Sequence, residues 1–213
     1  MTRPSLLVLE SAVEKRYAGL ATSCCSLSCG EALDLAAPAL GDVLVDLGCG
    51  RGQDVIRAAG RVGASGQAIG VDRTKEMIDK ARATVPPFLS NARFVCCDLA
   101  VLDLESGCAN VVISNCTINH AADKEAVYRE IHRVLAPGGR FVVSDVIAEQ
   151  ELPESVRNDP AAWAACYGGA IPEVNYLAAI QRAGFANVEV LHRTEPYERG
   201  RVMVRSLTIR GVR

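Results

Sequence analysis

The chain has 213 residues, which is the size of one domain with a substantial core. Its formal net charge is −2 with both signs dispersed, whereas a nucleic-acid-binding surface usually carries a basic stripe. No apolar run approaches the roughly 18 residues that cross a membrane, and residues 1–15 lack the long apolar segment of a secretory signal. We therefore expect a single-domain cytoplasmic protein that contacts neither nucleic acid nor membrane.

Nine cysteines are many for a chain of this length, and their number is odd. Disulfide frameworks are typical of small secreted domains, so we expect these thiols to be reduced. Reduced cysteines in an α/β protein are either small core residues or ligands. Four lie in or beside the strands predicted below, and we interpret them as core residues: Cys49, Cys96, Cys97 and Cys108.

The N-terminal part contains two predicted helices, at 10–17 and 31–39, with a loop between them. The Ser, Cys and Gly content of residues 21–30 indicates the loop. The loop holds three of the nine cysteines within six residues: Cys24, Cys25 and Cys29. This density makes the loop a candidate ligand-binding segment.

Residues 43–54, VLVDLGCGRGQD, predict a strand that stops abruptly and turns into a helix. The strand carries an acid and glycines follow at every second position: Asp46, then Gly48, Gly50 and Gly52. Glycines allow a tight turn and a close approach to a ligand because they lack a Cβ. The unpaired N–H groups of the following helix, predicted at 54–62, point to the same place. The spacing differs from the G-x-G-x-x-G of a dinucleotide site, so a tight turn without a ligand is the alternative at this point.

Two further strands, predicted at 67–71 and 93–97, are also followed or closed by acids. Asp72 lies about twenty residues beyond the glycines, where an acid can accept the two hydroxyls of a ribose. Asp98 follows the third strand and can reach an adenine amino group. The helix between these strands, predicted at 75–85, is amphipathic and is stopped by two prolines.

The fourth strand, predicted at 110–114, is apolar and leads into Asn115 and Cys116, with His120 shortly after. In open α/β sheets, residues beyond the carboxyl ends of parallel strands face the ligand crevice. We therefore expect these three side chains near the glycine turn.

The remaining chain continues with a helix at 124–135, a strand at 140–146 and an insert at 150–172. A helix at 172–183 and two strands at 187–192 and 202–210 complete it. The insert holds Cys166, and inserts after a late strand often cover the substrate. We interpret Trp163 and Tyr167 as packing groups of this lid. The last two strands predict an antiparallel hairpin. The whole pattern predicts an α/β fold with a mostly parallel seven-stranded sheet and helices on both faces.

Three successive strands that end in acids, with a glycine turn after the first, resemble the class I S-adenosylmethionine (SAM) methyltransferases, whose fold is Rossmann-like. The resemblance implies that Asp46 and the glycine turn hold the amino-acid part of SAM, Asp72 the ribose and Asp98 the adenine. It also implies a wider cofactor site, which would include Asp54, Arg73, Met77, Leu99, Asn115 and Cys116.

Four segments resemble one group more narrowly, the arsenite methyltransferases: SLSCG at 26–30, AIGVDRTKEM at 68–77, ISNCTINHAADK at 113–124 and ACYGGAIPEVNY at 165–176. The resemblance implies that Cys29 and Cys166 bind trivalent arsenic, with Cys25 or Cys24 as a further ligand. Thiolate is the soft ligand that this thiophilic element prefers. We expect a lone pair of the thiolate-bound arsenic to attack the SAM methyl group in line, a reaction that needs no general base. The substrate would be arsenite or its thiol conjugates, with glutathione or thioredoxin as reductant.

The sequence departs from that family at three places. His120 stands where an apolar residue is usual, SLSCG replaces SLGCG, and the sequence stops at Arg213 without the further cysteine-bearing domain of many members. We expect one domain with four parts: an N-terminal cap and cysteine loop at 1–41, a SAM-binding core at 42–148, a substrate lid at 149–172, and a C-terminal helix and hairpin at 173–213.

Other interpretations of the same residues stay open at this stage. The three N-terminal cysteines and Cys166 could hold a structural zinc, although no C-x₂-C pair is present, or their loop could be purely structural. An organic thiol, amine or hydroxyl acceptor commonly needs a base, for which His120 or Asp145 would be the candidates. A metalloid or zinc sensor that keeps the fold is the non-enzymatic alternative.

Overall fold

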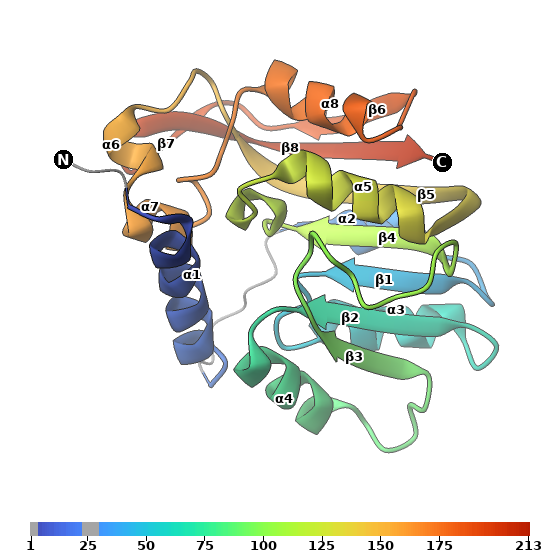
Figure 1. The fold of residues 1–213 in the computed structure, drawn as a ribbon. Coiled ribbons are helices and arrows are strands. Elements are labelled where there is room, and N and C mark those ends of the chain that lie inside the picture. Colours follow the sequence, from blue (N-terminus) through green and yellow to red (C-terminus); the bar gives the residue numbers. More distant parts are fainter. Residues whose placement is uncertain (1–3, 23–29) are drawn as a thin grey trace.

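The structure is a computed structural model that describes residues 4–22 and 30–213. A sheet of eight strands forms the centre of this described part (Figure 1). The strands are β1 (Val43–Leu47), β2 (Gln67–Asp72), β3 (Ala92–Cys96), β4 (Ala109–Asn115), β5 (Leu135–Ala148), β6 (Val188–Arg193), β7 (Tyr197–Arg199) and β8 (Val202–Val212). Their order is β3-β2-β1-β4-β5-β8-β6, and β7 pairs with β8. Strands β1 to β5 run parallel, whereas β8 is antiparallel to β5 and to β6. The predicted mostly parallel sheet is confirmed, and β7 is an additional short strand.

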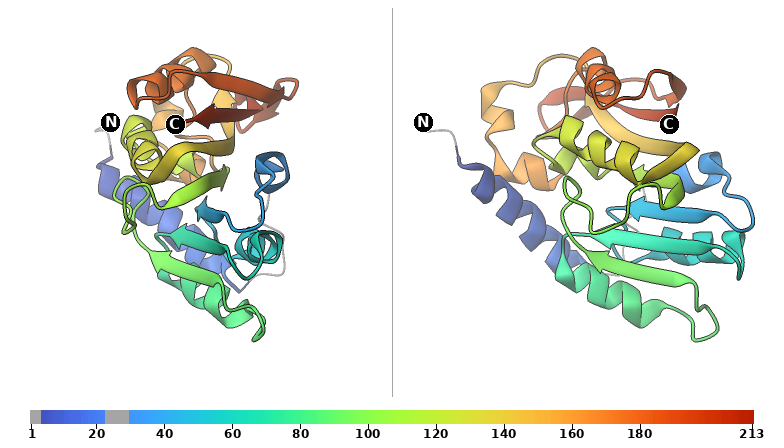
Figure 2. Two further views of the ribbon diagram at one scale, coloured as in Figure 1. Left: turned by 90° about the vertical axis from the view of Figure 1, so that its right-hand side faces the viewer. Right: turned by 45° about the vertical axis from the view of Figure 1, so that its right-hand side comes forward.

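Helices cover both faces of the sheet, as expected. They are α1 (Leu6–Leu20), α2 (Ala32–Ala36), α3 (Gln53–Val62), α4 (Lys75–Thr84), α5 (Lys124–Val134), α6 (Glu154–Arg157), α7 (Pro160–Ala164) and α8 (Glu173–Arg182), with a 3₁₀ turn, η1 (Ile118–His120). Figure 2 (left) shows α2 and α3 on one side of the strands and α5 on the other. Neighbouring residues of β1 point to opposite sides, because Leu44 packs with α2, α3 and α4 while Val45 packs with α5 and α8. Each face thus has its own apolar core.

Two predicted element boundaries were wrong, one for a local reason and one because of strand pairing. The helix predicted at 31–39 ends at Ala36, because Ala37 adopts a left-handed φ of 44° and precedes a proline, which disfavours helical backbone. The strand predicted at 140–146 begins earlier, at Leu135, which pairs with Ala109. The Pro-Gly-Gly segment that we expected to separate helix and strand therefore lies within β5.

Helix α1 lies outside the two helical layers and is longer than the predicted 10–17. It packs against α7 of the lid, and Leu9 and Val13 are its buried side chains. Figure 1 shows it beside α7, across the carboxyl ends of the parallel strands. Within the described residues, no helix combines the length and apolar character that a bilayer crossing requires. Helix α1 therefore covers the carboxyl ends of the parallel strands, where ligands are expected.

Candidate active site

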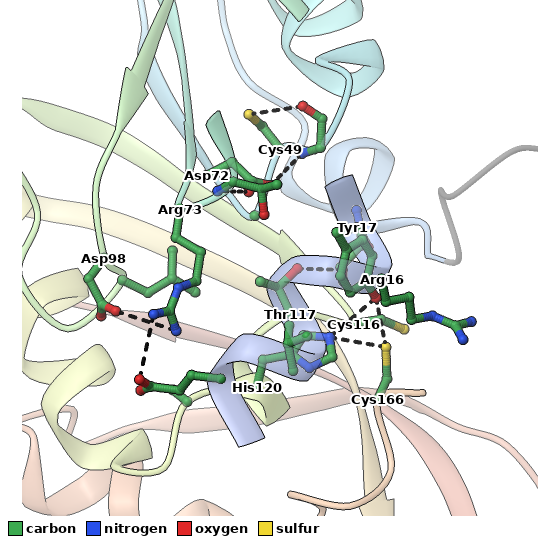
Figure 3. Close-up of a pocket in the computed structure, with 18 of the residues that line it drawn as sticks. Arg16, Tyr17, Cys49, Asp72, Arg73, Asp98, Cys116, Thr117, His120 and Cys166 are labelled. Atoms are coloured by element: carbon green, nitrogen blue, oxygen red, sulfur yellow. Dashed lines mark hydrogen bonds and ion pairs between the residues drawn. The ribbon is translucent and has the colours of Figure 1, made fainter. Parts of the chain in front are cut away.

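A cavity of about 480 Å³ opens at the carboxyl ends of β1 to β4. The turn after β1, the ends of β2, β3 and β4, one face of α1, and Cys166 of the lid form its walls. Figure 3 shows Asp72 and Asp98 towards one side and the sulfur atoms of Cys116 and Cys166 towards the other. The cavity therefore has an acidic end and a sulfur end.

The glycine turn forms the floor of the acidic end. The N–H of Gly48 donates to the carbonyl of Val71 at 2.7 Å, and the N–H of Gly50 donates to Asp72 Oδ2 at 3.0 Å. Gly48 has a φ of 74°, and a Cβ there would lie 2.2 Å from the Thr117 side chain. A side chain at this position is excluded by both backbone conformation and space. Thr117 thus packs directly on the Gly48 backbone, whereas a Cβ on Gly50 would meet nothing within 4 Å.

Two carboxyl groups of the acidic end, those of Asp46 and Asp72, are largely removed from water. Burial raises the pKa of Asp46 well above its usual value, and the nearby Asp54 and Asp72 raise it further. Burial also raises the pKa of Asp72, opposed by the N–H groups of Thr74 and Gly50, which donate to its carboxylate. Clustered acids of this kind favour a positively charged ligand, which would relieve their mutual repulsion.

Arg73 joins the third acid to helix α1. Its guanidinium lies 3.8 Å from Asp98 and 3.7 Å from Glu10 of α1. These pairs are half-exposed, so each contributes little to stability. Their position is informative, because they connect the cover helix to the acid that follows β3 (Figure 3).

Asn115, at the end of β4, connects the middle of the cavity to two other elements. Its Nδ2 donates to Asp54 at 3.3 Å, and its Oδ1 accepts from the N–H of Ala32 at 3.4 Å. A Cβ on Gly30 would lie 2.1 Å from Asn115 Oδ1. Gly30, where the described chain resumes, therefore packs directly against a residue of the cavity wall.

At the sulfur end, three side chains from distant segments meet. Cys166 Sγ lies 3.1 Å from the Tyr17 hydroxyl and 3.2 Å from His120 Nε2, and the hydroxyl and Nε2 are 3.2 Å apart. Burial lowers the pKa of His120 to about 4, opposed by the backbone of Trp163, so the ring is neutral near pH 7. Burial raises the pKa of Tyr17 above its usual value, and Cys166 and Cys116 raise it further. Tyr17 is therefore a neutral phenol that lies close to both thiols.

Cys116 and Cys166 share an uncommon backbone conformation. Their φ angles are 53° and 69°, and among the described residues only one other non-glycine residue, Ala37, has a positive φ. Non-glycine residues in this region are strained and occur preferentially at functional sites. Both cysteines lie on the wall of the same cavity, so the strain coincides with the place where a ligand would bind.

The buried Asn119 ties the lid to the sheet. Its N–H donates to Asp145 Oδ2 at 3.0 Å, and its Nδ2 donates to the carbonyl of Cys166 at 3.4 Å and to that of Val146. Asp145 also accepts from the Tyr176 hydroxyl at 3.3 Å. Asp145 is 2% exposed and is absent from the cavity wall. Its carboxylate supports the lid and does not face a substrate.

The chain is similar in sequence and fold to known methyltransferases. A family model described as a methyltransferase domain matches residues 40–197. The crystal structure of an arsenic(III) S-adenosylmethionine methyltransferase from Chlamydomonas reinhardtii is 30% identical in sequence, with a TM-score of 0.75, and the match covers 99% of this chain and 74% of that one. The chain belongs to the arsenite methyltransferase family.

Two further members of the family match most of the chain. The arsenite methyltransferase of Halobacterium salinarum is 40% identical over 173 residues, which are 81% of this chain and 44% of the relative. That of Aquipseudomonas alcaligenes is 36% identical over 195 residues, which are 87% of this chain and 53% of the relative. The chain thus spans about half the length of these two relatives.

Most of the site residues predicted from the sequence line the cavity: Asp46, Gly48, Gly50, Asp54, Asp72, Arg73, Asp98, Leu99, Asn115, Cys116 and Cys166. Gly52 and Met77 do not. A Cβ on Gly52 would lie 2.6 Å from the Phe94 ring, so this glycine serves helix packing. Met77 is fully buried because the helical spacing of α4 turns it towards the core. Cys24, Cys25 and Cys29 lie outside the described residues, so the prediction that they bind arsenic stays a prediction.

Sequence reasoning missed the part of the wall that α1 provides. Five cavity-lining residues of α1 recur at alternating spacings of four and three: Leu6, Glu10, Val13, Tyr17 and Leu20. This spacing describes one face of a helix and was available in the sequence. The sequence analysis placed this segment in an N-terminal cap but named none of its residues as part of the site. Arg16, Thr117 and Arg199 were also missed.

The interpretation of four cysteines as core residues was wrong for Cys96. Its side chain is exposed because Cys96 is the last residue of β3, the edge strand of the sheet, whereas Phe94 on the same face of that strand is buried. Cys97 and Cys108 are half-buried, and Cys49 is buried at the cavity wall. In residues 4–22 and 30–213, no three His, Cys, Asp or Glu side chains are grouped as a metal site. Three of the four cysteines of the zinc interpretation lie outside that part; the fourth is Cys166.

Proposed function

We propose that this chain transfers methyl groups from SAM to trivalent arsenic held by cysteine thiolates. One observation carries the proposal: an acidic, glycine-floored end and a sulfur end belong to the same 480 Å³ cavity. The membership of the arsenite methyltransferase family and the likeness to the Chlamydomonas reinhardtii enzyme support it.

The acidic end fits SAM. Nothing lies within 4 Å of a Cβ on Gly50, and Gly50 lines the cavity, so bare backbone of the turn faces open space. The buried Asp46, beside Asp54 and Asp72, favours a cation. When bound, SAM supplies a methyl group activated by a positively charged sulfonium. In this assignment Asp46 and the glycine turn hold the amino-acid part, Asp72 the ribose and Asp98 the adenine.

The sulfur end suits a soft, thiophilic element. We assign Cys166 as an arsenic ligand, and we add Cys116, which the sequence had suggested only as part of the cofactor wall. The support is that both cysteines line the cavity and both have a left-handed backbone conformation. Both also raise the pKa of the Tyr17 hydroxyl. Two or three sulfur ligands leave a lone pair on arsenic, so this nucleophile carries no proton and no base is required.

Cys29 belongs to the same proposal, with Cys25 or Cys24 as a further ligand. The support is that Gly30, the residue after Cys29, packs against Asn115, the residue before Cys116. Gly30 is the last residue of the loop predicted at 21–30, so this end of the loop meets the cavity wall beside the residue that precedes Cys116.

The finer parts of the proposal concern the setting of the reaction. We propose a cytoplasmic location and a thiol reductant such as glutathione or thioredoxin. Four cysteines with no assigned role, Cys49, Cys96, Cys97 and Cys108, are thiols, which agrees with a reducing compartment.

A SAM methyltransferase for an organic thiol, amine or hydroxyl is the alternative function. It would need a base at the cavity. Asp145 is buried away from the cavity wall, and His120, with a pKa lowered to about 4, is a poor base near pH 7. The structure therefore favours an acceptor that carries no proton.

The decisive experiment incubates the purified 213-residue chain with SAM, glutathione and arsenite, and identifies the arsenic products by mass. We expect methylated arsenicals from the wild type and none from Cys166→Ser or Cys116→Ser. Cys108→Ser, remote from the cavity, is the matched control and should retain turnover. Calorimetry should show unchanged SAM binding in all three variants. Full turnover by Cys166→Ser, or no methylated product from the wild type, would reject the proposal.

A further inference from the structure

The contact between Tyr17, His120 and Cys166 is the feature of the cavity that the proposed reaction does not yet use. The three polar atoms form a closed triangle with sides of 3.1, 3.2 and 3.2 Å. Figure 3 shows the Tyr17 hydroxyl and His120 Nε2 both directed at the Cys166 sulfur. Each side chain comes from a different element: α1, η1 and the lid segment that follows α7.

Tyr17 and His120 contact the Cys166 sulfur, whereas other groups bind its main chain. The carbonyl of Cys166 is bound by Asn119 Nδ2 at 3.4 Å, and its N–H donates to the carbonyl of Trp163 at 3.0 Å. These bonds hold the main chain of Cys166 in its left-handed conformation. They do not restrain rotation about the Cα–Cβ bond, on which the direction of Sγ depends.

Tyr17 and His120 are themselves held in place by packing. Their rings meet edge to face, with centroids 5.4 Å apart and planes at 77°. Tyr17 lies on the cavity face of α1, a helix that packs against α7, and His120 ends η1, whose Ile118 is fully buried. Two hydrogen-bonding groups with fixed positions therefore converge on one rotatable thiol.

We propose that Tyr17 and His120 are positioning residues that direct Cys166 Sγ towards the arsenic acceptor site. The inference rests on the proposed function. When Cys166 replaces a hydroxide on arsenic, a sulfur–arsenic bond forms, an arsenic–oxygen bond breaks, and the thiol proton leaves with the hydroxide as water. Tyr17 and His120 touch neither arsenic nor SAM in this step. They keep the sulfur in the rotamer from which the bond forms.

The test compares Tyr17→Phe, His120→Leu and His120→Gln with the wild type. Tyr17→Phe removes the hydroxyl but keeps the ring contact. His120→Gln places an amide nitrogen near the position of Nε2, whereas His120→Leu removes the polar contact. Unfolding transitions of all variants establish that they are folded. Methylation is measured at saturating SAM over a range of arsenite concentrations, and SAM affinity by calorimetry.

We expect Tyr17→Phe and His120→Leu to lower kcat/KM for arsenite about tenfold each, the size of one lost hydrogen bond. The loss should appear as a raised KM for arsenite, with SAM affinity unchanged. His120→Gln should recover most of the loss, which a role in packing alone would not predict. Arsenite binding can be followed independently by fluorescence of Trp163, the one tryptophan of the chain, three residues before Cys166.

Three results would overturn the inference. Wild-type kcat/KM in Tyr17→Phe and His120→Leu would show that the contacts do not position the sulfur. An equal loss in His120→Gln and His120→Leu, or a parallel fall in SAM affinity, would show a general structural role. If the wild type makes no methylated arsenical, the proposed function fails first and this inference fails with it, which separates the two failures.

Discussion

Gly48 allows the sharpest quantitative test of the cofactor end. Gly48→Ala places a methyl group where the Thr117 side chain now lies, 2.2 Å from its Oγ1 and Cγ2 and 2.6 Å from its Cβ. The φ of 74° adds the cost of left-handed backbone for a residue with a Cβ, about 1–2 kcal/mol. Gly50→Ala is the matched control, because its φ is also positive, at 50°, but nothing lies within 4 Å of the new Cβ.

The difference between the two variants measures the steric term. In Gly48→Ala, Thr117 must move and gives up the hydrogen bond from its Oγ1 to the Asn115 carbonyl, now 3.0 Å, which costs about 1 kcal/mol. Overpacking adds about 1–3 kcal/mol. We expect Gly48→Ala to lower the free energy of unfolding by about 3–6 kcal/mol, and Gly50→Ala by about 1–2 kcal/mol.

Urea denaturation without ligand measures both values. A double-mutant cycle with Thr117→Gly isolates the clash, because removing that side chain should make Gly48→Ala cost no more than Gly50→Ala. Equal losses in Gly48→Ala and Gly50→Ala, or no coupling with Thr117, would refute the reasoning and show that the turn relaxes around the new methyl group.

Three further predictions concern stability and cofactor binding. Gly60→Ala should raise the free energy of unfolding by about 0.5–1 kcal/mol in urea denaturation, because Gly60 lies inside α3 and its Cβ would meet nothing within 4 Å; a loss would contradict this. Asp72→Asn should cost about 1–3 kcal/mol and weaken SAM binding in calorimetry, because one carboxamide cannot accept from both Gly50 and Thr74 as the carboxylate does. His120 has a folded pKa of about 4 against 6.5 unfolded, so the unfolded state takes up the proton first as pH falls from 6.5 to 4, and the fold loses about 3 kcal/mol over this window. His120→Gln should remove that part of the pH dependence of unfolding, and an unchanged profile would show that the ring is not buried as described.

The cofactor end of the cavity was predictable because its residues follow adjacent parallel strands, which brings them close together. Parallel strands end at the same edge of a sheet, so acids at the ends of β1, β2 and β3 must lie near one another. Asp46 and Asp72 follow this rule, and the N–H of Gly50 joins their two turns. The apolar strand periodicity and the glycine turn are local signals, and local signals are readable in one sequence.

Predictions failed where a neighbour outside the segment decided the outcome. Cys96 follows the alternation of β3, but its exposure depends on β3 being the edge of the sheet. The Pro-Gly-Gly segment before Arg140 has the composition of a turn, yet it runs as strand because Leu135 pairs with Ala109 and the N–H of Gly138 donates to Arg213. Each case depends on pairing across many residues, which composition does not encode.

The sequence by itself determined the family, the residues that follow each parallel strand and the list of candidate thiols. Each of these can be read from short-range patterns and motifs. Only the tertiary structure decided which groups surround a given thiol. Tyr17 and Cys166 are 149 residues apart in the chain and 3.1 Å apart in space. Their contact exists because α1 packs against α7 across the carboxyl ends of the parallel strands. Helix packing of this kind depends on the fit of two surfaces, and a single sequence carries no pattern that pairs them.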